Sequence, residues 1–206
     1  MSEFMSYDPW RKVTTRNGFQ GDLVISALQK SIRRGLAEEA ITFAYEMYIT
    51  SSPFEEKLWR RLQAISVEDV GFGDLSAPVL INSLNQMRQN FSYTDPDRPI
   101  FFVHAIRYLA AAKKDRTSDN LKNIVITEFE YGRKPIIPDF AIDMHTEKGI
   151  SLGRDFKHFL EEGSRVENEL QVNENYKARL LELLDKIEQE EPQKVEDAFA
   201  YNSWQA

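Results

Sequence analysis

The chain has 206 residues, of which 42% are hydrophobic and 29% charged, and it contains no cysteine. This composition is typical of a folded protein, and the missing cysteines exclude a disulfide framework, a thiolate zinc site, an iron–sulfur cluster and a cysteine nucleophile. The net charge is −7, and the segment 161–197 alone, with twelve acidic and five basic residues, accounts for it. No run of eighteen apolar residues or signal-type segment occurs, so we expect a cytoplasmic protein that does not enter a membrane.

The first two thirds of the chain show the apolar spacing of amphipathic helices. After an irregular lead-in over residues 1–20, apolar residues recur every three or four positions. Pro53 and Pro99 are start signals, while Gly35 and Gly71 are stop signals. No alternation of period two persists. We therefore predict an all-α helical bundle with helices over 22–35, 36–51, 52–71, 75–91, 99–115 and 117–132.

The pattern changes after Gly132. Residues 133–155 contain two prolines and two glycines, which predicts an irregular segment with one or two short helical turns. Residues 175–191 have closely spaced leucines among charges, which predicts an amphipathic helix that ends before Pro192. The expected organisation is a lead-in over 1–20, a helical domain over 21–131, and an extension over 132–206.

The common catalytic motifs are missing from this sequence. There is no phosphate-binding G-x-x-x-x-G-K-[ST] loop, no G-x-G-x-x-G after a strand, and no serine in a G-x-S-x-G context. We therefore expect a protein that is not an enzyme, with neither catalytic nor cofactor-binding residues.

The three histidines allow one alternative. His104 lies in the most apolar helix, which predicts a buried or half-buried structural histidine. His145 and His158 lie among carboxylates that include Asp139 and Asp143, and imidazole with carboxylate can bind a metal. The H-E-x-x-H spacing is absent, which favours surface pairs. The alternative is a metal-dependent hydrolase with Asp143, His145 and His158 as candidate metal ligands.

Cations recur near the ends of the predicted helices. If they converge in space, they form a patch for DNA or another partner. Cations also favour helix C-termini because of the helix dipole, so a solvated face is the simpler interpretation. The candidate patch residues are Lys30, Arg33, Arg34, Lys113, Lys114 and Arg116.

The stretch RRLQAISVEDVGFGD (60–74) places two adjacent carboxylates, Glu68 and Asp69, at the end of a predicted helix. The helix dipole disfavours negative charge there, so the pair needs compensation. We predict that Glu68 or Asp69 makes a buried or half-buried polar link that fixes the turn between the third and fourth helices. Its partner would be a cation from another helix or the backbone N–H groups near Gly71 and Gly73.

Three stretches together resemble a known family. DLVISALQKSIRRGLAEEAITFAYEMY, RRLQAISVEDVGFGD and HAIRYLAAAKKD are similar to the C-terminal domain of the replication-associated recombination protein A family. These AAA+ ATPases are related to clamp loaders and include the eukaryotic Werner-helicase-interacting ATPase. The resemblance covers about residues 20–125, and its signature residues here are Lys30, Ser31, Arg33, Arg60, Arg61, Glu68, Asp69, Gly71 and Asp74.

The resemblance implies a helical oligomerisation domain of the clamp-loader collar type. It implies assembly as a homotetramer, a role in DNA replication and recombination repair, and an AAA+ ATPase or repair protein as a partner. ATP hydrolysis does not transfer, because this sequence has no Walker motif. The sequence therefore predicts a non-catalytic oligomerisation or interaction protein, with direct DNA binding as a further alternative.

Overall fold

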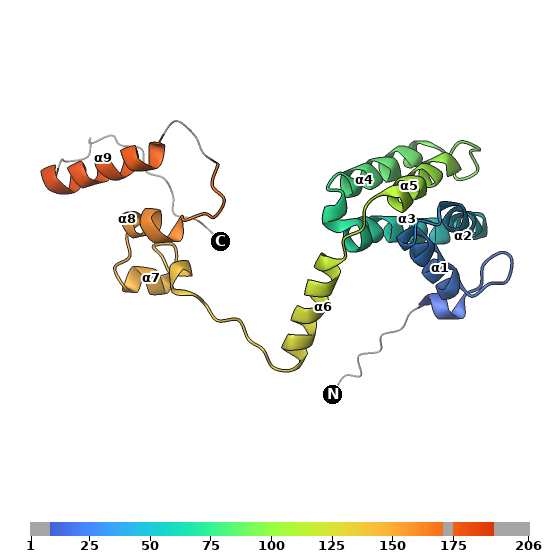
Figure 1. Cartoon of the computed structure of the whole chain (residues 1–206), viewed down its shortest axis with the longest axis horizontal. Coiled ribbons are helices and arrows are strands. Elements are labelled where there is room, and N and C mark those ends of the chain that lie inside the picture. The colour runs from blue at the N-terminus through green and yellow to red at the C-terminus, as the bar shows by residue number, and fades with distance from the viewer. Residues whose placement is uncertain (1–8, 171–174, 192–206) are drawn as a thin grey trace. The chain divides into compact units, whose positions relative to one another are not determined.

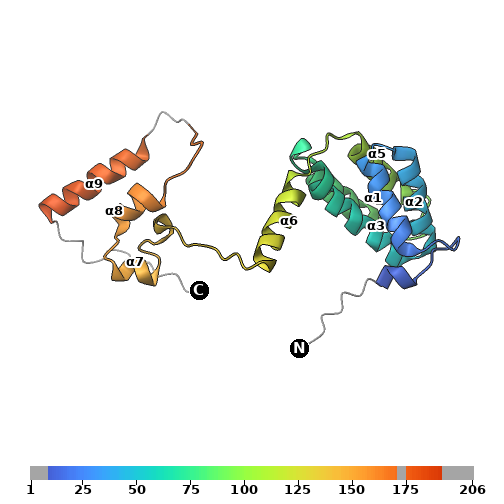
Figure 2. The same cartoon turned by 60° about the horizontal axis from the view of Figure 1, so that its bottom comes forward.

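The computed structural model describes residues 9–170 and 175–191 (Figures 1 and 2). The chain divides into two units, Met1–Arg133 and Lys134–Ala206. The described residues are mostly helical and form no strand beyond an isolated bridge between Thr14 and Gln20. The predicted all-α class is confirmed. Residues 1–8 of the predicted lead-in lie outside the described residues.

The first unit is a bundle of five helices followed by a sixth. The five are α1 (Gly21–Arg33), α2 (Ala37–Thr50), α3 (Ser52–Ile65), α4 (Ala77–Met87) and α5 (Pro99–Ala111). Short turns η1 (Pro9–Lys12), η2 (Ser66–Val70), η3 (Gly71–Gly73) and η4 (Arg88–Asn90) flank them. The sixth helix, α6 (Thr117–Glu130), extends away from the bundle (Figure 1).

Helical spacing explains the core of this bundle. α3 buries Phe54, Leu58, Leu62 and Ile65, which follow one another at intervals of three or four residues. Ser51 caps this helix by accepting a hydrogen bond from the backbone N–H of Phe54 (3.4 Å). α2 packs against α1, α3 and α5, so these four helices share one core.

The prediction for His104 was wrong. α5 buries Phe102, Ala105 and Leu109, whereas His104 lies on its exposed face. A helix with a very apolar sequence still presents one side to solvent when it covers a core from one side. The spacing of apolar residues normally identifies the buried side of a helix. In α5 so many residues are apolar that the spacing does not distinguish the buried side from the exposed one.

A charged cluster, which we call the core cluster, lies inside the bundle and was not predicted. It consists of Glu55, Arg88 and Arg98, whose side chains are 0%, 1% and 10% exposed. Arg98 donates from Nε and Nη2 to the two carboxylate oxygens of Glu55, at 2.9 and 3.0 Å. Arg88 Nη1 lies 3.2 Å from Glu55 Oε2. The cluster ties α3 to the segment between α4 and α5.

The second unit contains short helices and one longer one. They are η5 (Asp139–Ala141), α7 (Glu147–Ser151), α8 (Phe156–His158), η6 (Phe159–Gly163) and α9 (Tyr176–Glu190). Ile142 and Leu160 are its buried apolar side chains among the described residues. α9 falls where the amphipathic helix was predicted, and Asn175 caps it. Along the described chain, no helix combines the length and apolar character needed to cross a membrane.

Candidate interaction site

The acidic pair predicted to need compensation lies in the π-helical turn η2, which continues α3. Asp69 is fully buried and Glu68 is 26% exposed. Arg33 of α1 donates from Nε to Asp69 Oδ1 at 2.7 Å, and Arg116 donates from Nη1 to the same oxygen. The predicted polar link is confirmed, and its partners are arginines from α1 and from the residue preceding α6.

Glu68 joins the same group of charges, which we call the rim cluster: Arg33, Arg61, Glu68, Asp69 and Arg116. Arg33 Nη2 lies 3.3 Å and Arg61 Nη2 lies 3.6 Å from the Glu68 carboxylate. Gln29 donates from Nε2 to Glu68 Oε1 at 2.9 Å and to Asp69 Oδ2 at 3.2 Å. Because these donors occupy both carboxylates, the geometry suits a structural role better than proton transfer or metal binding.

The backbone of this turn approaches the start of α6 closely. The N–H of Asp115 donates to the carbonyls of Asp69 (3.0 Å) and Val70 (3.1 Å). A Cβ added at Gly71, where φ is +51°, would lie 2.4 Å from the Asp115 carbonyl oxygen, and one at Gly73 would lie 2.5 Å from that of Lys113. The two glycines therefore allow a contact that any side chain would obstruct.

The other signature residues lie outside this contact. Asp74 accepts hydrogen bonds from Ser76 and Tyr108, and these bonds hold the pKa of the Asp74 carboxyl below its usual range. Lys30 is exposed and donates to Ser26 Oγ (2.7 Å), Ser31 is half-buried, and Arg60 is exposed. Some signature residues therefore meet in the rim cluster, whereas Lys30, Ser31, Arg60 and Asp74 lie outside it.

The candidate basic patch is largely committed to internal contacts. Arg33 and Arg116 face the rim cluster carboxylates. Lys114 Nζ donates to the carbonyls of Leu109, Ala110 and Ala112 at the end of α5, at 2.6 to 3.0 Å, and burial lowers the pKa of this amine. Lys30, Arg34 and Lys113 are exposed and remain available to an anionic partner. Lys114 thus contacts the carbonyls of a helix C-terminus, where the helix dipole favours a positive charge.

Of the candidate metal ligands, all of which the structure describes, Asp143 and His145 contact each other, and His158 makes no hydrogen bond or ion pair with either. Asp139 forms a bidentate pair with Arg154 Nη2 (2.7 and 2.8 Å), and Asp143 accepts from the backbone N–H of His145 (2.9 Å) and lies 3.2 Å from its Nδ1. His158 is half-buried, and its Nδ1 makes no hydrogen bond within the described residues. Among the residues with described positions, no three His, Asp or Glu side chains are grouped to hold a metal ion.

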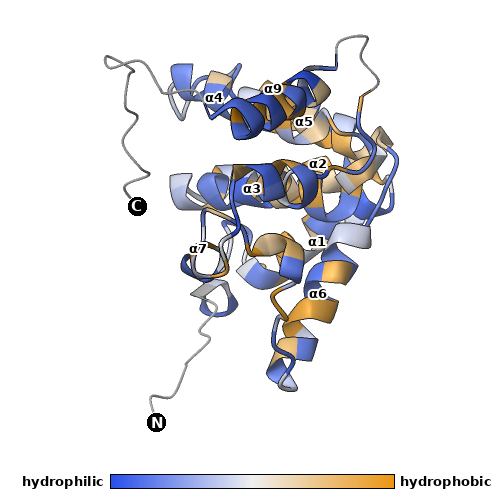
Figure 3. Ribbon diagram, turned by 90° about the vertical axis from the view of Figure 1, so that its left-hand side faces the viewer, coloured by the Kyte–Doolittle hydropathy of each residue, from blue (hydrophilic) through white to orange (hydrophobic). Residues whose placement is uncertain are grey.

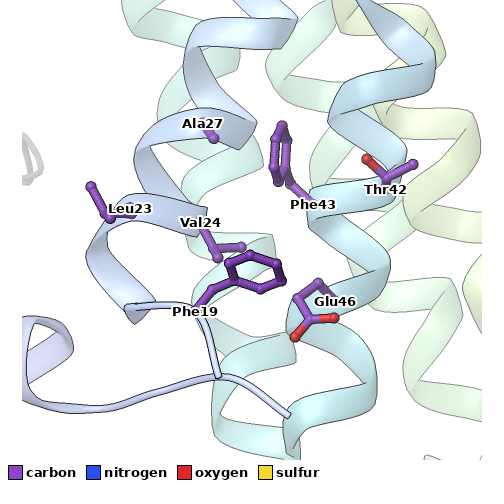
Figure 4. Close-up of a pocket in the computed structure, with 7 residues that line it drawn as sticks. All are labelled: Phe19, Leu23, Val24, Ala27, Thr42, Phe43 and Glu46. Atoms are coloured by element: carbon purple, nitrogen blue, oxygen red, sulfur yellow. The ribbon is translucent and has the colours of Figure 1, made fainter. Parts of the chain in front are cut away.

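Two apolar surfaces of the first unit were not predicted. One is the outer face of α6, which carries four apolar residues that are 41% to 61% exposed: Leu121, Ile124, Val125 and Phe129. Figure 3 shows orange, hydrophobic stretches along the ribbon of α6. The other is a pocket of about 380 Å³ between α1 and α2 (Figure 4). It is lined by Phe19, Leu23, Val24, Ala27, Thr42, Phe43 and Glu46.

Comparison with known proteins identified no relative: no family model matches the chain, and no curated protein is significantly similar to it. The resemblance to the replication-associated ATPases therefore rests on the three sequence stretches described above. The packed contact around η2 includes five of the signature residues: Arg33, Arg61, Glu68, Asp69 and Gly71.

Proposed function

We propose that this chain is a non-catalytic helical interaction protein that assembles with copies of itself. The observation that supports this proposal best is the exposed apolar face of α6. Exposed apolar patches on a helix are typical of protein–protein interfaces. Within α6, whose residues are all described, Asp119 is the one buried residue, so the helix meets the bundle at its first turn and presents its length to solvent.

The composition of α6 strengthens this argument. A helix of fourteen residues is marginal in water by itself. Four consecutive residues, 124–127, are β-branched, which lowers helix propensity further. A helix with this sequence gains stability chiefly by burying its apolar face. A second copy of the chain would supply a matching apolar surface, as in symmetric homo-oligomers.

The sequence resemblance supports the same function. In the replication-associated ATPase family the corresponding domain joins subunits, so we propose a homotetramer. We also propose a setting in DNA replication and recombination repair, in the cytoplasm, with an AAA+ ATPase as partner. A pull-down from native cells would test the last point, and recovery of no ATPase would argue against it.

Light scattering coupled to size-exclusion chromatography tests the self-assembly. At tens of micromolar, the wild-type chain should elute as an oligomer. Val125→Asp places a charge in the α6 face and should yield a monomer, because an unpaired charge is costly to bury in an interface.

Val79→Asp provides a matched control. Val79 is 72% exposed on α4, so its substitution changes charge equally but leaves α6 intact. This variant should remain oligomeric. A monomeric wild-type chain would overturn the proposed function, whereas an oligomer that Val125→Asp leaves intact would move the interface away from α6.

A further inference from the structure

The pocket between α1 and α2 contains a buried charge. Glu46 is only 9% exposed and lines the pocket. Its Oε1 accepts from the backbone N–H of Asn17 (3.0 Å), and its Oε2 accepts from the Asn17 side-chain amide (2.6 Å). Among the described residues, no Lys, Arg or His forms an ion pair with it. Hydrogen bonds from Asn17 hold this carboxylate in place, and a cationic ligand would add an ion pair that the described residues do not make.

Glu46 is nevertheless held in its charged form. Burial by itself raises the pKa of this carboxyl, but hydrogen bonds from Thr15 and Asn17 and the positive charge of Arg16 outweigh burial and lower the pKa below its ordinary value. The charge therefore persists at neutral pH. Each carboxylate oxygen has two lone pairs, so an additional donor can bind beside Asn17.

The rest of the pocket is apolar and aromatic. In Figure 4, Phe19 and Phe43 point into the space between the two helices, and the Glu46 carboxylate lies beside Phe19. Phe19 and Leu23 are 58% and 60% exposed, so the pocket opens at the surface of the unit. A volume of about 380 Å³ lies within the range of small-molecule sites.

We propose that this pocket binds an organic cation, an ammonium or guanidinium group carried on an apolar body. The cationic group would pair with Glu46, and the apolar body would lie against Phe19, Phe43 and Leu23. Aromatic faces attract cations through their quadrupole, so the walls and the carboxylate favour the same ligand. The Glu46 charge would repel an anion, and a neutral ligand would form no ion pair with it.

Three probes of nearly equal shape test the proposal: phenethylammonium, 2-phenylethanol and 3-phenylpropionate. Each is titrated into the ¹⁵N-labelled full chain, and amide shifts of the pocket segments are followed by NMR. The ammonium should bind about tenfold more tightly than the alcohol, because both can donate to the Glu46 carboxylate but only the ammonium adds a charge–charge attraction. The carboxylate probe should bind most weakly.

Two variants separate charge from shape. Glu46→Gln keeps an oxygen acceptor for Asn17 and should remove the tenfold preference for the ammonium over the alcohol. Phe19→Ala, at an exposed position that does not threaten folding, should weaken both probes. Phe72→Ala is the matched control, because Phe72 is 73% exposed and lies outside the pocket. It should leave both affinities unchanged.

Comparison of phenethylammonium with the peptide acetyl-Phe-Lys-amide distinguishes the source of the cation. Tighter binding of the peptide supports a lysine-bearing protein segment, and tighter binding of the amine supports a small metabolite; both agree with the proposal. Equal affinity for the ammonium and the alcohol would overturn it. An ammonium preference that survives Glu46→Gln would overturn it as well.

Discussion

Two groups of arginines and carboxylates stabilise the first unit, and they differ in solvent exposure. In the core cluster every side chain is at most 10% exposed. In the rim cluster Asp69 is fully buried, but Arg33, Arg61 and Arg116 are 25% to 32% exposed. If a charged side chain of the rim cluster is removed, water can therefore reach the arginines that it paired with. Water cannot reach the charges of the core cluster in the same way.

This difference separates the energetic roles of the two clusters. A buried ion pair contributes little net stability over apolar packing, but removal of one partner leaves a costly unpaired charge. A half-exposed pair costs less to break. We infer that the core cluster makes correct packing of α3 and α5 obligatory, and that the rim cluster fixes the place where α6 begins.

The largest expected effect is at the centre of the core cluster. Glu55→Ala would remove the carboxylate that Arg98 pairs with and one of the two that Arg88 pairs with, and it should reduce the free energy of unfolding by about 3–5 kcal/mol. Urea denaturation followed by circular dichroism measures this change. Glu56→Ala is the control, because Glu56 is 51% exposed and pairs only at its tip with Arg88, so its loss should cost about 1 kcal/mol or less. If Glu55→Ala and Glu56→Ala lowered the free energy of unfolding equally, the distinction between buried and exposed ion pairs would be wrong.

A smaller effect is expected at the buried carboxylate of the rim cluster. Asp69→Asn removes the charge that accepts from Arg33 and Arg116 and should cost about 1.5–3 kcal/mol. Hydrogen exchange should also show faster opening at the start of α6. Glu68→Gln, at the half-exposed position, should change both measurements less. A variant Asp69→Asn as stable as the wild type would show that Arg33 and Arg116 are not held by this carboxylate.

The backbone contact beside the rim cluster gives the third prediction. Gly71→Ala combines an unfavourable positive φ with a collision at the Asp115 carbonyl, and it should reduce stability by about 1–3 kcal/mol or more. Gly132 also has a positive φ (+92°), but a Cβ there meets nothing within 4 Å. The melting temperature of Gly132→Ala therefore measures the destabilisation caused by the positive φ alone, without a collision. Equal melting temperatures for the two variants would show that a Cβ at Gly71 does not collide with the Asp115 carbonyl.

The smallest expected effect is the pH dependence at Asp119, the residue that anchors α6. Its pKa is held below the usual range, first by Lys122 and then by Arg116. A lowered carboxyl pKa stabilises the fold above the unfolded pKa of about 3.9, and this contribution is lost as pH falls through the folded-state pKa. Asp119→Asn should therefore differ from the wild type at pH 7 and converge with it in acid. A constant difference in melting temperature from pH 7 to pH 3 would contradict this.

Local signals in the sequence are enough to predict the helices and the need for compensation at η2. Apolar residues at intervals of three and four, with Pro53 and Pro99 at starts, are local signals that hold in any packing arrangement. Adjacent carboxylates at a helix end are also a local signal, and they predict a buried or half-buried polar link.

Which groups satisfy these requirements depends on how the helices pack against one another. The partners of Asp69 are Arg33 and Arg116, 36 and 47 residues away in the chain. The core cluster, the exposed side of His104 and the pocket at Glu46 depend equally on how the helices pack. The spacing of apolar residues predicts that one face of a helix is buried, but it does not predict which neighbouring helix covers that face. Charge pairing and cavity shape are set by contacts between helices, so the spacing within one helix cannot predict them.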